Sequence, residues 1–183
     1  MDIIPDSSFF ICFLDDLEGL LPIDDRVRIL SQITSNFRVI ILPEVNHESR
    51  FERIASLIKA QVKWVKIPAS DTQNNPSIEL LRPLLGKGEH QVITYAYGCL
   101  VKGNSRFIFI LDDGLARNLV KRILPTLISH MKGTVGFIGH CAIHKVLEKK
   151  EAIDVITNIG DSKFRVDRAT ITTVITEVRN RCA

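Results

Sequence analysis

The chain has 183 residues, 45% of them hydrophobic and 25% charged, which excludes a disordered chain and suits one domain over residues 1–183. Its longest apolar runs, such as 107–111, are too short to cross a bilayer, so we expect no membrane partner. The net charge of +3 hides an asymmetry, because residues 1–25 carry seven acidic and no basic side chains and the remainder therefore holds +10.

Short apolar runs rich in β-branched and aromatic residues predict five strands. In chain order they cover residues 3–4, 38–42, 62–67, 106–111 and 127–130. The run 106–111 is continuously apolar, as a strand covered on both faces of a parallel sheet requires. Pro5 has no N–H for a ladder hydrogen bond, so we expect the first strand to be short or kinked.

Helical periodicity separates these runs. It is found near residues 9–14, 24–35, 43–60, 77–84, 88–101, 113–123, 134–148, 151–159 and 167–180. In the segment 113–123, Leu115, Leu119 and Ile123 recur at the four-residue spacing of one helix face. Alternating strands and helices predict an α/β fold with a mostly parallel sheet covered on both sides, in which ligands bind at the carboxyl ends of the strands.

Acidic residues follow two of the predicted strands. Asp6 comes after the first strand, and Asp112 and Asp113 come after the strand at 106–111, so we expect all three at the carboxyl edge of the sheet. Asp113 could instead cap the following helix, although a single cap needs only one of two consecutive aspartates. A solvated acidic surface would also explain the acid-rich first 25 residues.

Two further acids are expected to point toward the same edge. Glu89 shares a helical stripe with Val92, Ala96 and Cys99, and an inward carboxylate is costly unless it is paired or binds a metal. The alternative is a first-turn acid that complements the helix dipole.

Glu48 and Glu44 both lie in the first turns of the helix that begins after the second strand, and the sequence leaves open which of them faces the site. A solvated helix face explains both acids. Carboxylates that converge in one cleft repel one another, and Mg²⁺ or Mn²⁺ would relieve that repulsion and support phosphodiester hydrolysis.

Read in order, several segments resemble the PIN (PilT N-terminus) domain family. The segments are IIPDSSFF, VIILPEVNHES, LLGKGEHQVITYAYG, FIFILDDGLARNLVKR, MKGTVGFIGHCAIHK and KFRVDRATITTVITEVRN. The Gly-x-Gly-Glu and Asp-Asp-x-x-Ala-Arg segments are the more specific signals, and they are similar to a prokaryotic branch related to VapC-type toxins. The resemblance implies a PIN-like three-layer α/β/α sandwich and a ribonuclease that acts on single-stranded RNA with Mg²⁺ or Mn²⁺.

The resemblance also implies roles for individual residues. Asp6, Glu89 and Asp113 would be metal ligands, and Asp112 and Glu48 would be auxiliary acids. Ser8 would be a nearby hydroxyl, Thr134 would cap a helix facing the pocket, and Arg117 could reach a phosphate or make a surface salt bridge within its helix. All three are expected to contact the substrate. The implied partners are RNA, a small antitoxin protein and a second copy of the chain.

Other classes of protein remain to be weighed against this one. A catalytically silent PIN-like module that binds nucleic acid or protein is the main alternative. A nucleotide-binding or phosphoryl-transfer protein is disfavoured, because no G-x-x-x-x-G-K-[ST] segment occurs and Asp6 is not part of an Asp-x-Asp. The four cysteines form no C-x-x-C pair, and with no signal peptide evident we expect buried thiols and a cytoplasmic protein.

Overall fold

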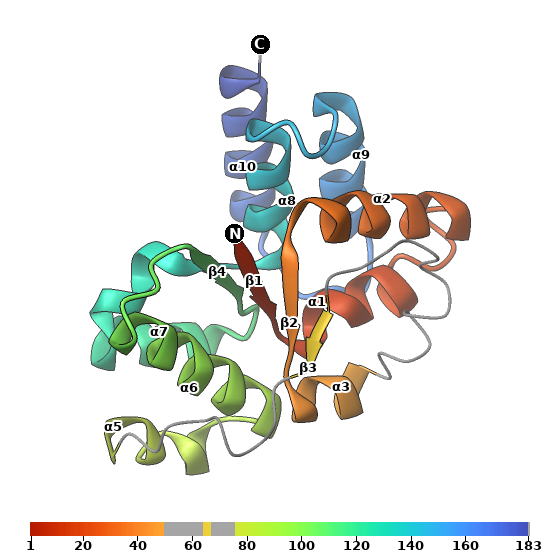
Figure 1. Cartoon of the computed structure of the whole chain (residues 1–183). Helices are drawn as coiled ribbons and strands as arrows, with labels where there is room; N and C mark the ends of the chain where they lie inside the picture. Colours follow the sequence, from red (N-terminus) through yellow and green to blue (C-terminus); the bar gives the residue numbers. More distant parts are fainter. Residues whose placement is uncertain (50–63, 67–75, 183) are drawn as a thin grey trace.

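A computed structural model describes residues 1–49, 64–66 and 76–182, and it shows a parallel sheet with helices on both faces (Figure 1). The strands are β1 (Asp2–Pro5), β2 (Arg38–Ile41), β3 (Trp64–Lys66), β4 (Phe107–Ile110) and β5 (Met131–Lys132). They are ordered β3-β2-β1-β4-β5, and each neighbouring pair is parallel. The prediction of an α/β sandwich with a parallel central sheet is confirmed.

Most of the predicted helices are present. The α-helices are α1 (Ser7–Ile11), α2 (Ile23–Asn36), α3 (Pro43–Ser49), α5 (Pro76–Glu79), α6 (Lys87–Val101), α7 (Gly114–Ile123), α8 (Thr134–Ile143), α9 (Lys149–Asp161) and α10 (Arg168–Arg181). Shorter turns of helix are η1 (Cys12–Asp16), η3 (Arg82–Leu84) and η4 (Pro125–His130). The predicted helix 43–60 starts as expected, and its continuation past Ser49 lies outside the described residues. No helix within the described ranges has the length and apolar content to span a membrane.

Pro5 is accommodated inside β1 because of where its missing N–H would point. The backbone N–H groups of Asp2 and Asp6 donate to the carbonyl oxygens of Arg106 and Ile110 on the β4 side. Because successive N–H groups of a strand point in opposite directions, the N–H groups of residues 2, 4 and 6 point toward β4. Pro5 therefore faces the β2 side, where the β1–β2 register ends at Ile3. The strand is short, at four residues, and it delivers Asp6 to the carboxyl edge with no ladder bond lost.

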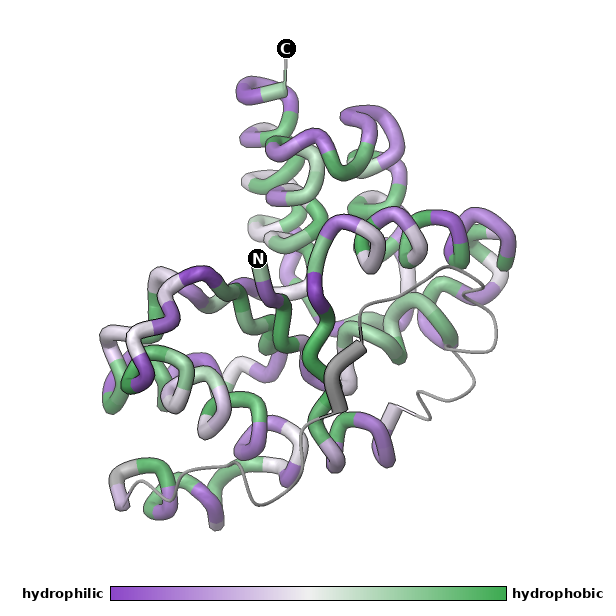
Figure 2. The backbone as a smooth tube through the Cα atoms, in the orientation of Figure 1, coloured by the Kyte–Doolittle hydropathy of each residue, from purple (hydrophilic) through white to green (hydrophobic). Residues whose placement is uncertain are grey.

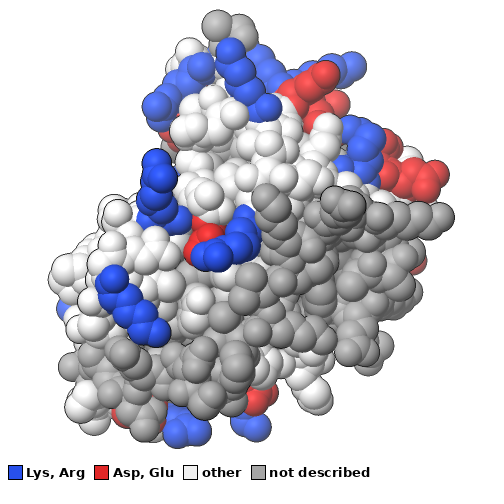
Figure 3. Space-filling model, in the orientation of Figure 1, with Lys and Arg blue, Asp and Glu red and all other residues white. Residues whose placement is uncertain are grey.

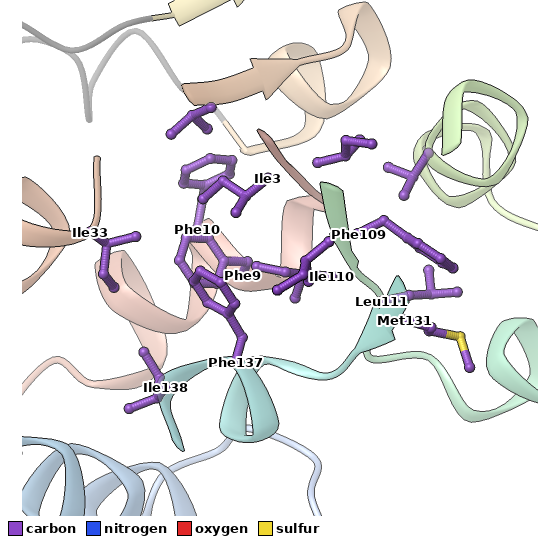
Figure 4. Packing of buried hydrophobic residues seen from close by; sticks show 14 of the residues in the cluster. Ile3, Phe9, Phe10, Ile33, Phe109, Ile110, Leu111, Met131, Phe137 and Ile138 are labelled. Atoms are coloured by element: carbon purple, nitrogen blue, oxygen red, sulfur yellow. The ribbon is translucent and has the colours of Figure 1, made fainter. Parts of the chain in front are cut away.

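Apolar side chains pack on both faces of the sheet, and the helices form the outer layers of a three-layer structure (Figure 1). On one face Phe9 of α1 packs against Phe137 of α8, with ring centroids 5.9 Å apart. On the other face α6 packs against β1 and β4 with Val92 and Ala96 fully buried. Figure 4 shows Ile110 of β4 beside Phe9 and the neighbouring Phe109 pointing away, as alternation along a strand requires.

Hydropathy along the backbone follows this arrangement. Figure 2 shows hydrophobic colour through the central strands and hydrophilic colour at the outer ends of the helices. Helices α8, α9 and α10 pack on one another and stand together at one end of the molecule (Figure 1). Among the described residues seen in Figure 3, basic side chains lie in several separate groups, with acidic and uncharged side chains between them.

Two expectations about this half of the chain need correction. Residues 127–130 form part of the 3-10 helix η4, which Pro125 begins, and the last strand follows it as β5 at Met131–Lys132. The apolar stripe of α7 is also displaced from the core: Leu115 and Ile123 are 57% and 43% exposed, while Ala116 and Val120 are buried. A four-residue repeat identified the helix but not the face that it buries.

Candidate functional site

The strand order places the acids that follow β1 and β4 next to each other. Asp6 follows β1 directly, and Asp112 lies two residues beyond the end of β4, its neighbour in the sheet. The backbone N–H of Asp112 donates to Oδ2 of Asp6 over 3.2 Å. The predicted meeting of these residues at the carboxyl edge is therefore present in the structure.

Asp6 is a buried carboxylate with two backbone donors. Its side chain is 1% exposed, and Oδ1 accepts the N–H of Phe9 over 3.2 Å and so caps α1. Burial raises the pKa of Asp6 well above its usual range, and the charges of Asp112 and Glu89 add to that rise against the two N–H bonds. Holding Asp6 and Asp112 ionised together is unfavourable in this protein without a nearby cation.

Asp112 is fixed by Thr134. The backbone N–H and the hydroxyl of Thr134 donate to its two carboxylate oxygens over 2.8 and 2.6 Å. Burial raises the pKa of Asp112, while the Thr134 bonds and the positive charge of Arg117 oppose the rise. Thr134 has no exposed area, and the cap of α8 is Gly133 without a side-chain bond, so the predicted capping and substrate contact of Thr134 are wrong. Its observed role is to position Asp112.

Asp113 is the N-cap of α7. Its Oδ1 accepts the N–H of Ala116 over 2.8 Å, which confirms the capping alternative. The side chain is nevertheless exposed, and it lies close enough to Glu89 for its charge to raise the pKa of that carboxyl. Asp113 thus combines a structural bond with a place at the acidic edge.

Glu89 projects from the first turn of α6 above the predicted buried stripe, in which Val92 and Ala96 have no exposed area. It is itself half-buried, and burial raises its pKa, with the charges of Asp113 and Glu48 as smaller causes. Its Oε2 accepts the N–H of Gly86 over 2.8 Å, which is one half of a capping box, since glycine has no side chain to return the bond. Glu89 thus makes a hydrogen bond in the first turn of its helix and is also half-buried near the other acids.

Glu48, rather than Glu44, reaches the neighbourhood of Glu89. Its two carboxylate oxygens accept the N–H of Gly88 over 3.2 Å and the hydroxyl of Ser7 over 2.8 Å. A Cβ on Gly88 would stand 2.5 Å from Oε2 of Glu48, so this approach requires glycine there. The structure therefore resolves the choice that the sequence left open, although Glu48 is exposed and lies at the margin of the site.

A cavity of about 350 Å³ opens over these acids. It is lined by Ser8, Ile11, Asp16, Glu89, Asp112, Asp113, Gly114, Lys163, Phe164 and Arg165. Ser8 thus lines the cavity as predicted, whereas Asp6 and Glu48 are not part of its lining. We name this space the acidic cavity.

Sequence reasoning missed the basic side of the acidic cavity. Lys163, Phe164 and Arg165 belong to the connection between α9 and α10, some fifty residues beyond the Asp-Asp pair. Only the packing of α8, α9 and α10 brings this connection to the sheet edge. The Lys-Phe-Arg run itself was the one available signal, since two cations flanking an aromatic ring suit a nucleic acid strand.

Arg117 lies on the other side of Asp112. Its Nη1 donates to the carbonyl of Leu111 over 2.9 Å, and it lines a second cavity of about 480 Å³ rather than the acidic one. It forms no salt bridge with any described residue, so the helix salt bridge considered from the sequence is absent from the described structure. Its charge still acts on Asp112.

The donor set suits a hard divalent cation by chemistry, since it consists of carboxylate oxygens. Among the described residues, however, no three acidic, histidine or cysteine side chains converge as a ready metal-binding group. Each of the five acids already accepts at least one hydrogen bond from the protein. An ionised carboxylate has about four lone-pair sites, so these bonds leave acceptor capacity on each side chain.

No protein-family model matches this chain, and the comparisons with curated proteins and with solved structures give no significant match. The resemblance to the PIN domain family therefore stays a prediction that rests on the sequence segments quoted above. What the fold supplies independently is an acidic cavity at the carboxyl edge of a parallel sheet, the usual position of ligand sites in such folds.

Proposed function

We propose that the acidic cavity binds Mg²⁺ or Mn²⁺ and that the protein hydrolyses internal phosphodiester bonds of single-stranded RNA. The observation that carries the proposal is that acidic and basic side chains line the same cavity. Glu89, Asp112 and Asp113 line one side, and Lys163 and Arg165 line the same cavity from a different part of the chain. A cation site beside phosphate-binding side chains is the arrangement that phosphodiester hydrolysis needs.

The residues would divide the work according to their positions. A bound divalent cation supplies a water of lowered pKa and stabilises charge that develops on the phosphate. Asp6 and Asp112, whose ionised forms burial disfavours, would both be ionised once the cation is bound, and Thr134 keeps Asp112 oriented. Lys163 and Arg165 would bind the phosphate, and half-buried Phe164 offers a face on which a base can stack.

A silent binding module is the second candidate, and one observation favours it. All five acids are engaged in capping or bridging hydrogen bonds, and no three-ligand group is assembled among the described residues. A protein that used these acids only for structure would look the same. Metal-dependent turnover separates the two candidates.

The test uses a circular single-stranded RNA, which has no ends and is linearised only by internal cleavage. We expect linear product with Mn²⁺ or Mg²⁺, none with EDTA, and strongly reduced product with Asp112→Asn. Asparagine keeps Oδ1 as an acceptor for Thr134 N–H and can donate to its hydroxyl, so the fold should persist. The matched control is Asp154→Asn on an exposed part of α9. If the protein binds RNA but no metal ion supports cleavage, the nuclease proposal fails and the silent binding module is the remaining candidate.

The finer parts of the proposal follow the sequence resemblance. We infer a toxin of a toxin–antitoxin pair, with a small antitoxin protein and a second copy of the chain as partners, acting in the cytoplasm. Expression should then arrest growth for the unaltered chain but not for Asp112→Asn at equal protein level. Light scattering on the purified protein should give the mass of two chains, against 20.6 kDa for one.

A further inference from the structure

The second cavity, on the far side of Asp112, adjoins the acidic cavity. It shares Asp112, Gly114 and Arg165 with that cavity, so the two spaces meet along these residues. Its own charged lining comes from Arg117, Lys132 and Asp167. We name this space the basic cavity.

The two cavities differ in the sign of their charge. The acidic cavity has four carboxylates against two cations, whereas the basic cavity has three cations against two carboxylates. Both acids of the basic cavity are already engaged, since Asp167 accepts the N–H and hydroxyl of Thr170 over 2.7 and 2.6 Å and Asp112 is bonded to Thr134. Both carboxylates of the basic cavity therefore already accept hydrogen bonds from the protein.

Within the described ranges, the three cations of the basic cavity take part in no salt bridge. These cations are Arg117, Lys132 and Arg165. Lys132 is half-buried at the end of β5, and its charge is among the causes that lower the pKa of His140. Cations gathered without a salt-bridge partner attract an anion.

Close packing holds the boundary between the cavities. A Cβ on Gly133 would stand 3.0 Å from Oδ1 of Asp112 and 3.1 Å from Nη1 of Arg117. The absence of a side chain at Gly133 thus allows the carboxylate of Asp112 and the guanidinium of Arg117 to lie against the same stretch of backbone. The change from negative charge at Asp112 to positive charge at Arg117 thus lies beside Gly133, the residue that caps α8.

We propose that the basic cavity binds a phosphate of the same RNA strand, next to the phosphate held in the acidic cavity. This inference rests on the proposed function for its ligand class. The strand crosses over Asp112, with Arg165 between the two phosphates and Lys132 beyond them. Because basic side chains lie on both sides of the acids, the strand passes through the site instead of ending in it, which accounts for cleavage at internal bonds.

The experiment measures binding of a fluorescently labelled single-stranded RNA by anisotropy in EDTA, where no cleavage can occur. Affinity is recorded over a series of salt concentrations for the unaltered chain, for Lys132→Ala and for Lys132→Ala with Arg165→Ala. Each lost phosphate contact should reduce the slope of log affinity against log salt by about 0.7, so the double variant should lose about 1.4. The control is Arg122→Ala, an exposed cation on α7 that lines neither cavity.

The outcomes separate this inference from the nuclease proposal. A reduced slope in both cavity variants but not in Arg122→Ala supports the second phosphate site, whether or not metal ions permit cleavage. Slopes that match the control overturn it, even if the unaltered chain cleaves circular RNA. Circular dichroism of each variant excludes loss of fold as the cause, since Lys132 and Arg165 make no described side-chain hydrogen bond whose removal would unfold the protein.

Discussion

The acidic and basic cavities lie on either side of Asp112 and differ in the charge of the side chains that line them. On one side, burial raises the pKa of both Asp6 and Asp112, and the charge of Asp112 adds to the rise for Asp6. On the other side, Arg117 and the Thr134 donors oppose that rise for Asp112. Carboxylates of the acidic cavity are therefore hard to ionise together unless a cation binds between them. The cations of the basic cavity have no salt-bridge partner among the described residues, and a bound phosphate would supply one.

Glu89→Gln should have the largest effect, on the acidic side alone. Glutamine retains an oxygen that can accept the Gly86 N–H, so the first turn of α6 should remain capped. The loss of one carboxylate from the cavity should reduce metal-dependent RNA cleavage by at least about a hundredfold. Cleavage rates under saturating Mn²⁺ measure this, with Glu18→Gln on an exposed turn as the control. Equal rates for both variants would remove Glu89 from the site.

Asp112→Asn should make the metal-free protein more stable near neutral pH. The folded-state pKa of Asp112 is raised, so the folded chain binds more protons, and its unfolding free energy falls as pH rises from the ordinary carboxyl value through the raised one. Removing this ionisation should raise the unfolding free energy by roughly 1 kcal/mol at about pH 7 and by nothing at low pH, where Asp112 is protonated in both states.

Urea unfolding of both proteins across pH tests this expectation. Added Mg²⁺ should stabilise the unaltered chain more than Asp112→Asn, since a ligand that binds only the folded state raises its stability. A variant that is less stable than the unaltered chain at every pH would contradict the idea that charge at Asp112 is unfavourable.

Gly133→Ala should disturb both cavities at once. The added methyl group would press on Asp112 Oδ1 and Arg117 Nη1 and displace them, at a cost of about 1 kcal/mol in stability. Gly98→Ala is the matched control, because its Cβ would meet nothing within 4 Å inside α6 and should stabilise the helix by about 0.5–1 kcal/mol. Thermal unfolding of the pair measures the difference. The same direction of change in both would show that the boundary is not tightly packed.

His140 should report the charge of the basic side with a smaller effect. Burial, with the charges of His144 and Lys132, lowers the pKa of His140 to about 4. The depressed pKa contributes stability above the ordinary imidazole value, which is lost as pH falls toward 4. Because His140 is only half-buried, solvent screening should limit this loss to about 1 kcal/mol, and His140→Gln should abolish it.

Nuclear magnetic resonance titration of His140 connects that effect to the basic cavity. Its pKa should rise in Lys132→Ala and stay unchanged in Lys150→Ala, an exposed cation on α9. An unchanged titration in Lys132→Ala would mean that Lys132 does not act on this side of the molecule as described.

Much of the fold could be predicted because the sequence patterns are local. The continuous apolar run at β4 and the possible cap at Asp113 predicted these elements and the edge at which the acids meet. The last strand was misplaced because Pro125 starts a 3-10 helix in the segment 127–130, and β5 is only two residues long. Such a short strand carries no periodicity that a sequence can show.

The site was predicted less completely, for a different physical reason. Asp6 and Asp112 meet because they follow adjacent strands, which topology dictates. Lys163 and Arg165 reach the acids only through the packing of α8, α9 and α10, a contact with no local signature. Thr134 was expected to face substrate, yet it is buried beneath Asp112, because sequence spacing does not distinguish a residue that binds a ligand from one that holds the ligand-binding residue.

Direct titration of Mn²⁺ by electron paramagnetic resonance tests the central claim, that the acidic cavity is a cation site. The unaltered chain should bind one Mn²⁺ at millimolar concentration or below, and the combined Glu89→Gln and Asp112→Asn variant should bind none under the same conditions. The combined Lys132→Ala and Arg165→Ala variant should retain the ion or bind it more tightly, since two repelling cations are gone. An unaltered chain that leaves Mn²⁺ free, or a double acid variant that binds it equally well, would contradict the account.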